Sequence, residues 1–233
     1  MPNSDVAVSP KFFNREIAEA YDGRNSALTP ISDCLHFLMH LVLADQPVNA
    51  RVLCVGVGTG AEILTLAIAN PGWSFVGVDP SGEMLEVGRR RLEEAGLLQR
   101  CELLQGYAED VTQDCFDAAV SLLVAHFVKR EDRHRFYSAI HNRLRPGGRF
   151  VCAEISCDLD ASTFPDMLKD WKSIQLLMGS TQESLAKLGK MIRDVLDVLS
   201  PADTEAMLKA SGFWEPVPFF QAYMIRGWHA ARD

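Results

Sequence analysis

Residues 51–60 read Arg-Val-Leu-Cys-Val-Gly-Val-Gly-Thr-Gly, and a second apolar run, Phe-Val-Gly-Val at 75–78, stops at Asp79. An apolar strand, a glycine turn, a helix and a second strand ending in a carboxylate are typical of the first half of a nucleotide-binding βαβ unit. Glycine has no Cβ, so the backbone can approach a ligand closely, and a carboxylate can accept two hydrogen bonds from a ribose diol. We therefore expect this stretch to bind an adenosine-containing cofactor.

The composition limits the class of protein and of substrate. A chain of 233 residues that is 48% apolar can bury a sizeable core in one domain. Its formal net charge of -8 argues against extended contact with nucleic acid, which favours a small-molecule substrate. The longest nearly apolar run, 34–44, is shorter than the roughly 20 residues of a membrane span, so we expect no membrane insertion.

The cysteine pattern and the N-terminus bear on the compartment. The chain has 6 cysteines and no Cys-x-x-Cys pair, and three of the thiols fall inside expected strands. Reduced thiols in such positions pack as small hydrophobes, which indicates a reducing, cytoplasmic context. Residues 1–5 carry no basic segment leading into an apolar one, so we expect no secretory signal.

Strand and helix patterns alternate after residue 50. The expected strands lie at 51–55, 74–78, 101–105, 116–123 and 149–155, and the expected helices between them lie at 61–69, 81–95 and 131–144. A Pro-Gly-Gly turn at 145–148 precedes the fifth strand. Strands that alternate with helices predict an α/β fold, a doubly wound, mostly parallel, Rossmann-like sheet.

The remainder of the chain departs from this alternation. Residues 158–199 carry two amphipathic helical patterns without a strand between them, and Trp171 lies on the aromatic stripe of the first. This stripe fits a substrate-pocket wall, plain core or a dimer contact. Ser200 and Pro201 then begin another helix, and 214–231 predicts two strands in an antiparallel hairpin, which brings the sheet to seven strands.

Four segments follow from these patterns. We expect an N-terminal helical lid at 1–48, a cofactor-binding core at 49–156, a helical insertion at 157–200 that serves as a lid or dimer contact, and a C-terminal helix and hairpin at 201–233 that complete the core.

The glycine turn alone leaves the cofactor open, because Gly56, Gly58 and Ala61 also satisfy a dinucleotide fingerprint. The wider context narrows it. The chain resembles the class I S-adenosylmethionine-dependent methyltransferases from about residue 51 to residue 231. The matching segments are Val-Leu-Cys-Val-Gly-Val-Gly-Thr-Gly at 52–60, Gly-Val-Asp-Pro-Ser-Gly-Glu-Met-Leu at 77–85, Gly-Tyr-Ala-Glu-Asp at 106–110 and Leu-Arg-Pro-Gly-Gly at 144–148.

This resemblance implies S-adenosylmethionine as the cofactor and assigns residues to each part of it. At Gly56, Gly58 and Gly60 the backbone would approach the methionine part. Asp79 would bind the ribose hydroxyls.

The resemblance also implies contacts to the base. Pro80 and Met84 would border the adenine, Ala108 would present its amide to the ring edge, and Glu109 is a candidate for the exocyclic amine. Many relatives have aspartate where this chain has Tyr107.

The reacting end is the least defined part of the prediction. The resemblance implies that Ser121 and Leu123, at the end of the fourth strand, would lie beside the sulfonium and the incoming nucleophile. Tyr21, His126 and Glu154 are candidate catalytic or substrate contacts. His126 could equally cap the next helix, and Glu154 could be an ordinary strand-end carboxylate.

Two further features qualify the family resemblance. Cys54 stands two residues before the first glycine, where the family often has an acidic residue. The segments 191–199, 210–213 and 219–222 are similar to the end of the carboxy-S-adenosylmethionine synthase family, which acts in tRNA wobble-uridine modification. That family uses an arginine for the extra carboxylate, and no residue of the corresponding helix here matches it.

The sequence thus predicts a methyltransferase that acts on a small-molecule acceptor by in-line transfer. The alternatives are a carboxy-S-adenosylmethionine synthase-like or tRNA-modifying enzyme, a non-catalytic cofactor-binding protein, and a nicotinamide dehydrogenase. A homodimer is compatible with the insertion. His36 and His40 are four residues apart, but no third ligand is evident, so we expect no metal site.

Overall fold

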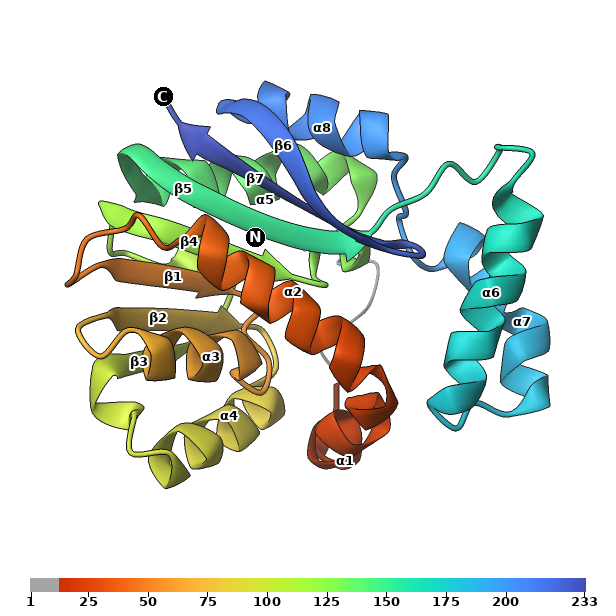
Figure 1. Ribbon diagram of the computed structural model, residues 1–233, viewed down its shortest axis with the longest axis horizontal. Helices are drawn as coiled ribbons and strands as arrows, with labels where there is room; N and C mark the ends of the chain where they lie inside the picture. Colours follow the sequence, from red (N-terminus) through yellow and green to blue (C-terminus); the bar gives the residue numbers. More distant parts are fainter. Residues whose placement is uncertain (1–12) are drawn as a thin grey trace, which may run out of the picture.

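The structure, a computed structural model, describes residues 13–233 (Figure 1). The expectation about a secretory signal at residues 1–5 lies outside the described residues. Within them, no helix is long and apolar enough to cross a membrane.

One seven-stranded sheet forms the centre of the molecule (Figure 1). Its order is β3-β2-β1-β4-β5-β7-β6. The strands are β1 (Arg51–Val55), β2 (Ser74–Asp79), β3 (Cys101–Gln105), β4 (Phe116–Leu122), β5 (Leu144–Ile155), β6 (Phe213–Ala222) and β7 (Ile225–Arg232). β1 to β5 pair in parallel, whereas β7 is antiparallel to both β5 and β6. The predicted Rossmann-like sheet with an antiparallel C-terminal hairpin is therefore confirmed.

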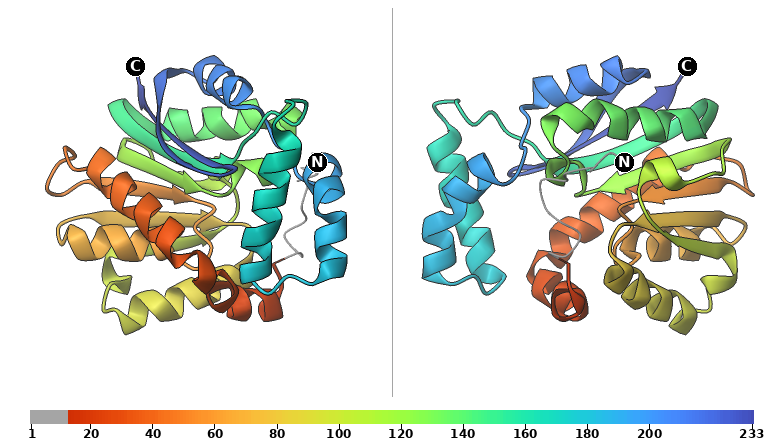
Figure 2. Two further views of the ribbon diagram at one scale, coloured as in Figure 1. Left: turned by 45° about the vertical axis from the view of Figure 1, so that its right-hand side comes forward. Right: turned by 180° about the vertical axis from the view of Figure 1, so that it is seen from behind.

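Helices cover both faces of the sheet. They are α1 (Arg15–Asn25), α2 (Thr29–Val42), α3 (Ala61–Ala69), α4 (Gly82–Glu94), α5 (Arg130–Arg143), α6 (Phe164–Leu177), α7 (Gln182–Asp194) and α8 (Pro201–Ala210). Side chains of α2, α3 and α4 share one buried cluster with the sheet, and side chains of α5 and α8 share another. Figure 2 shows these layers in two further views, the second from behind.

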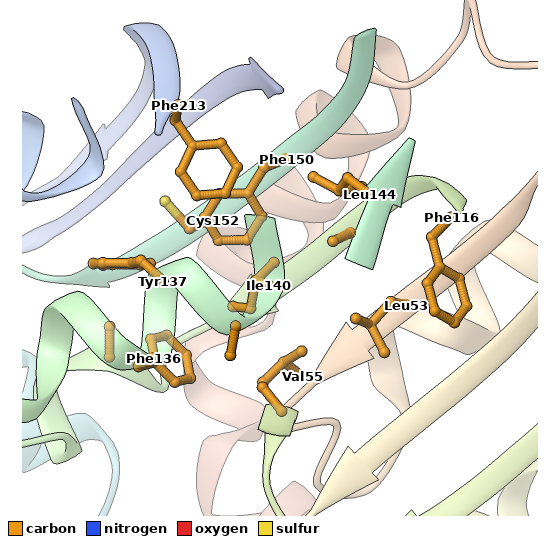
Figure 3. Close-up of a cluster of buried hydrophobic side chains, with 14 of the residues drawn as sticks. Leu53, Val55, Phe116, Phe136, Tyr137, Ile140, Leu144, Phe150, Cys152 and Phe213 are labelled. Carbon is orange, nitrogen blue, oxygen red and sulfur yellow. The ribbon is translucent and has the colours of Figure 1, made fainter. Parts of the chain in front are cut away.

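The core beneath α5 illustrates why the sheet face is apolar. Ile140 of α5 and the strand residues Val55 and Phe150 are fully or almost fully buried in the same cluster. Figure 3 shows their side chains meeting between the helix and the strands. Burial of such side chains contributes roughly 1.5–3 kcal/mol each. The packed face holds the carboxyl ends of β1 and β4 side by side.

Strand β5 begins earlier than the sequence indicates. Pairing already starts at Leu144, opposite Phe116, and then shifts register before Arg149 pairs with Ala118. The expected turn lies inside this irregularity, and Gly147 has the positive φ of 73° that the Pro-Gly-Gly sequence predicts. The turn is thus a bulge within a longer strand, because the chain keeps hydrogen bonding to β4 on both sides of it.

Helices α6 and α7 form a pair set to one side of the sheet (Figure 1). Trp171, Leu188 and Ile192 are buried in a cluster that also includes Met224 and Ile225 at the β6–β7 turn. Ser200 caps α8 as the sequence predicts, its side chain accepting a hydrogen bond from the backbone N–H of Asp203 at 3.1 Å.

Candidate functional site

A cavity of about 780 Å³ opens at the carboxyl ends of β1, β2 and β4. Its lining comes from the turn after β1, the end of β2, the loop at 106–110, residues 122–124 after β4, and α1 with the start of α2. Ligands of open α/β sheets bind at this edge of the sheet. The volume falls within the range of roughly 300–1,000 Å³ that is usual for small-molecule sites.

The glycine turn is shaped by close contacts that exclude side chains. Gly56 and Gly58 line the cavity with φ angles of 70° and 51°. A Cβ on Gly56 would lie 2.3 Å from Cγ2 of Val124, so position 56 admits only glycine. Gly60, with φ of 78°, is the N-cap of α3 and lies just behind the lining.

Asp79 joins the turn to the end of β2. Its Oδ2 accepts a hydrogen bond from the Gly58 N–H and its Oδ1 one from the Ser81 N–H, both at 2.9 Å. Burial raises the pKa of the Asp79 carboxyl, and these two hydrogen bonds oppose the shift. The carboxyl group is thus fixed in orientation while it lines the cavity.

The loop at 106–110 forms a further wall. Ala108 is buried, and Ala108, Glu109, Pro80 and Met84 all line the cavity. The Glu109 carboxylate pairs with Arg135 at 3.0 Å.

Helix α1 lies over the cavity and is linked to the glycine turn. Asp22 of α1 pairs with Arg91 of α4 at 2.9 Å, and its Oδ1 accepts a hydrogen bond from the Thr59 hydroxyl at 3.0 Å. Arg91 also donates to the Thr59 carbonyl at 3.0 Å. Tyr21, one residue earlier, lines the cavity.

The end of β4 supplies an apolar wall. Leu123 lines the cavity and adopts a φ of 59°, which is unusual for a residue with a side chain. Leu28, Ile31 and Leu123 pack against the cluster that contains Ile225, and all four residues line the cavity. This part of the cavity therefore fits an apolar group.

Three of the sequence-predicted site residues lie behind the lining. Ser121 is buried inside β4. His126 is buried, its Nδ1 accepts a hydrogen bond from the Ile155 N–H at 3.3 Å, and burial lowers its pKa to about 3. Glu154 is buried against α5, where it pairs with Arg133 at 2.8 Å and accepts a hydrogen bond from the Tyr137 hydroxyl at 3.1 Å.

The contacts of His126 and Glu154 are those of packing residues, so neither enters the chemistry proposed below. Trp171 is likewise buried between α6 and α7 and is not among the described residues that line the cavity. Within residues 13–233, no group of three or more His, Cys, Asp or Glu side chains could hold a metal ion.

Glu62 is a further residue of the site that was not predicted from the sequence. This residue lies in the first turn of α3, is 6% exposed, and lines the cavity. Burial raises the pKa of its carboxyl to about 8. Acidic residues are common in the first turn of a helix, so Glu62 carries no distinctive sequence signal. The absence of an acid at Cys54 is the one feature that could have drawn attention to it.

The chain is similar to known methyltransferases and related enzymes. A family model described as "Methyltransferase domain" matches residues 52–148. The chain is 24% identical to a carboxy-S-adenosyl-L-methionine synthase of Trichodesmium erythraeum, over 88% of this chain and 81% of that protein. It is 33% identical to a ubiquinone/menaquinone biosynthesis C-methyltransferase of Geotalea daltonii, over 46% of each.

The fold also matches solved structures. Human N-acetylserotonin methyltransferase, solved in complex with S-adenosylmethionine, superposes with a TM-score of 0.59 at 15% identity. The match covers 84% of this chain and 50% of the human chain, so this chain spans about half the length of that enzyme.

Proposed function

We propose that the chain is a class I S-adenosylmethionine-dependent methyltransferase that transfers the cofactor's methyl group to a small acceptor with an apolar body. The observation that carries this proposal is the continuity of one cavity. Asp79 and the glycine turn lie at one part of it, and the apolar wall around Leu123 and Ile225 lies at another.

The lining residues fit S-adenosylmethionine by their chemistry. Asp79 offers a fixed carboxyl group to a ribose diol, and Gly56 and Gly58 expose backbone where a Cβ would intrude. Met84 and the buried Ala108 give an apolar border that suits the adenine ring. With the positive φ of Gly56 and Gly58, the backbone of the turn would approach the amino-acid part.

When bound, S-adenosylmethionine supplies a methyl group on a positively charged sulfur that is a good leaving group. The protein can therefore obtain much of the rate by holding the nucleophile about 3–3.5 Å from the methyl carbon and in line with it. We assign this positioning to the wall formed by Leu28, Ile31 and Leu123. Tyr21 is the cavity-lining polar residue that we propose contacts the acceptor.

The test is a methyl-transfer assay with acceptors graded by polarity. We expect turnover with acceptors that combine a nucleophilic atom with an apolar body. Leu123→Asp should raise the KM for the acceptor while S-adenosylhomocysteine affinity stays within about threefold. An acceptor preference that is unchanged in this variant would contradict the assignment of the wall.

A carboxylated cofactor is the second candidate, favoured by the extent of similarity to carboxy-S-adenosyl-L-methionine synthases. An additional carboxylate would need a cationic partner. Among the described residues, the two arginines that line the cavity are engaged, Arg91 by Asp22 and Arg135 by Glu109. Mass spectrometry of ligand retained by the purified protein separates the two cofactors by the mass of the carboxyl group.

The remaining assignments concern the whole chain. We propose that α1 and the start of α2 act as the lid, because they line the cavity. We assign α6 and α7 to contacts outside the cavity, including a homodimer contact, since Leu177 at the end of α6 and Val195 directly after α7 are exposed. The described cysteines are all free thiols, which supports the proposed cytoplasmic location.

A further inference from the structure

The acidic residue nearest to the glycine turn at 56–60 lies two residues after the turn, at Glu62, whereas Cys54 lies two residues before it. Cys54, two residues before the glycine turn, is fully buried in the cluster beneath α2, α3 and α4. Glu62, two residues after the turn, is buried at the start of α3 and lines the cavity. The carboxyl group of Glu62 is near enough to raise the pKa of the Cys54 thiol. A carboxyl group is therefore available beside β1, although β1 itself does not supply one.

Glu62 has no cationic partner among the described residues. None of the ion pairs within 4.0 Å in residues 13–233 involves it. Arg91 is the cation that acts on it electrostatically, but Arg91 is held by Asp22 at 2.9 Å and by Thr59. The other charged or titratable groups around Glu62 are Asp79, Cys54 and Tyr21.

A buried carboxylate is costly unless a cation or several hydrogen bonds compensate it. Neighbouring Asp79 adds to this cost because it is also acidic. A positively charged group that enters the cavity would relieve both effects. S-Adenosylmethionine carries such a group in the α-ammonium of its amino-acid part, and the glycine turn at 56–60 leads directly into the helix that carries Glu62.

We propose that the Glu62 carboxylate binds the α-ammonium group of the cofactor and replaces the acidic residue that Cys54 lacks. This inference rests on the proposed function and adds to it the residue that holds the amino-acid end. A proton leaves the Glu62 carboxyl as the ammonium binds, because a nearby cation favours the ionised form of an acid.

The test compares two probes by isothermal titration calorimetry. S-Adenosylhomocysteine has the amino-acid part, whereas 5′-methylthioadenosine keeps the adenosine and the sulfur without it. In Glu62→Gln we expect the affinity for S-adenosylhomocysteine to fall about ten- to hundredfold and that for 5′-methylthioadenosine to stay unchanged. Glutamine preserves the shape and removes a buried charge, so the variant should fold.

Glu83→Gln is the matched control. Glu83 is the second residue of α4, as Glu62 is of α3, but it is exposed and lies outside the cavity lining. It should bind both probes as the parent protein does.

The outcomes distinguish a failure of the proposed role of Glu62 from a failure of the proposed function. Unchanged S-adenosylhomocysteine affinity in Glu62→Gln, or equal losses for both probes, overturns the role of Glu62 and leaves the proposed function standing. If the parent protein binds neither probe, the proposed function falls and this inference falls with it.

Discussion

At the scale of single residues, the proposed cofactor site depends on side chains held by backbone hydrogen bonds from the turns beside them. Asp79 accepts hydrogen bonds from Gly58 and Ser81, so the turn after β1 and the end of β2 fix each other. Such local arrangements follow from glycine conformation and strand spacing, which is why the sequence alone predicts the turn and the acid that faces it.

Replacement of Asp79 tests the ribose contact. Asp79→Asn keeps one acceptor oxygen but loses the charge, and hydrogen bonds to a charged group are worth roughly 1.5–3 kcal/mol. We expect about ten- to hundredfold weaker binding of both S-adenosylhomocysteine and 5′-methylthioadenosine, because both carry the ribose. Calorimetry measures this, with circular dichroism as the check that the fold is intact. Unchanged affinity for both would contradict the contact.

The pKa of Glu62 makes a separate prediction for the protein without ligand. Burial raises this pKa from 4.5 to about 8 in the folded state. Because its pKa is higher in the folded than in the unfolded state, the protonated Glu62 carboxyl is compatible with the fold at low pH. The free energy of unfolding then falls as the pH rises through the window from 4.5 to 8.

The stability of Glu62→Gln relative to the parent should therefore increase with pH across that window, by at most about 1.4 kcal/mol for each pH unit. Thermal unfolding at pH 5, 7 and 9 measures the difference. A gap between the two proteins that does not change with pH would show that the Glu62 carboxyl is not perturbed by burial.

Residues whose role depends on distant packing were harder to predict from the sequence. Glu154 and His126 follow or end strands at the expected edge of the sheet, yet their side chains lie under α5 and beside β5. The strand pattern does not indicate which helix covers each face. Glu62 was not predicted, because its burial at the cavity depends on how α3 packs against β1 and β2.

At the scale of elements, α1 is a part of the proposed lid that polar contacts attach to the glycine turn and to α4. It is tied to the glycine turn through Asp22 and Thr59, and to α4 through Arg91 on the cavity side and Arg15–Glu86 on the outer side. The inner pair, Asp22–Arg91, is less exposed than the outer pair, Arg15–Glu86. Both residues of the inner pair also form hydrogen bonds with Thr59 of the turn. We infer that the inner contacts set the position of the lid over the cofactor.

Breaking the inner contact should loosen the lid without unfolding the sheet. In Arg91→Met, α1 loses a charge partner while the apolar stem is retained, so we expect faster hydrogen exchange in residues 15–25 and faster release of S-adenosylhomocysteine. Global stability should fall by about 1 kcal/mol or less. Hydrogen-exchange mass spectrometry and stopped-flow release report these effects.

Glu86→Gln is the control for that experiment, because it breaks the exposed 3.2 Å pair with Arg15 on the same two helices. Equal effects of the two variants on ligand release would contradict a special role for the inner contact.

The elements themselves were predicted well where periodicity and turn chemistry agreed. The strands β1 to β4 and the helices α3, α4 and α5 lie within a few residues of their expected positions. The start of β5 was predicted too late because a Pro-Gly-Gly sequence signals a turn, and only the pairing with β4 shows that the strand continues through it. Pairing partners are a tertiary property that local sequence does not encode.

At the scale of the whole molecule, one buried network connects the sheet to the helices at its C-terminal side. Arg133 of α5 pairs with Glu154 of β5, and it also donates to the carbonyls of Val128 and Asp197. The Tyr137 hydroxyl donates to the same carboxylate. The network therefore joins α5, β5 and the segment after α7, which are far apart in the sequence.

Glu154→Gln tests whether this network serves stability or chemistry. The Arg133 and Glu154 side chains are 0% and 1% exposed, so removal of the carboxylate charge leaves a buried guanidinium without its counterion. Loss of one partner of such a pair costs about 3–5 kcal/mol, a large share of the stability of a typical domain. We expect a lower denaturant midpoint with an unchanged slope, and S-adenosylhomocysteine affinity equal to that of the parent at temperatures where the variant is folded.

Glu183→Gln supplies the contrast, because it breaks the exposed Glu183–Lys187 pair and should cost less than about 1 kcal/mol. If Glu154→Gln instead kept its stability and lost methyl transfer, Glu154 would belong to the reacting site. The sequence analysis had allowed that role, and the closed set of contacts around the carboxylate argues against it. Cofactor binding is thus expected to depend on Asp79 and Glu62 and not on Glu154.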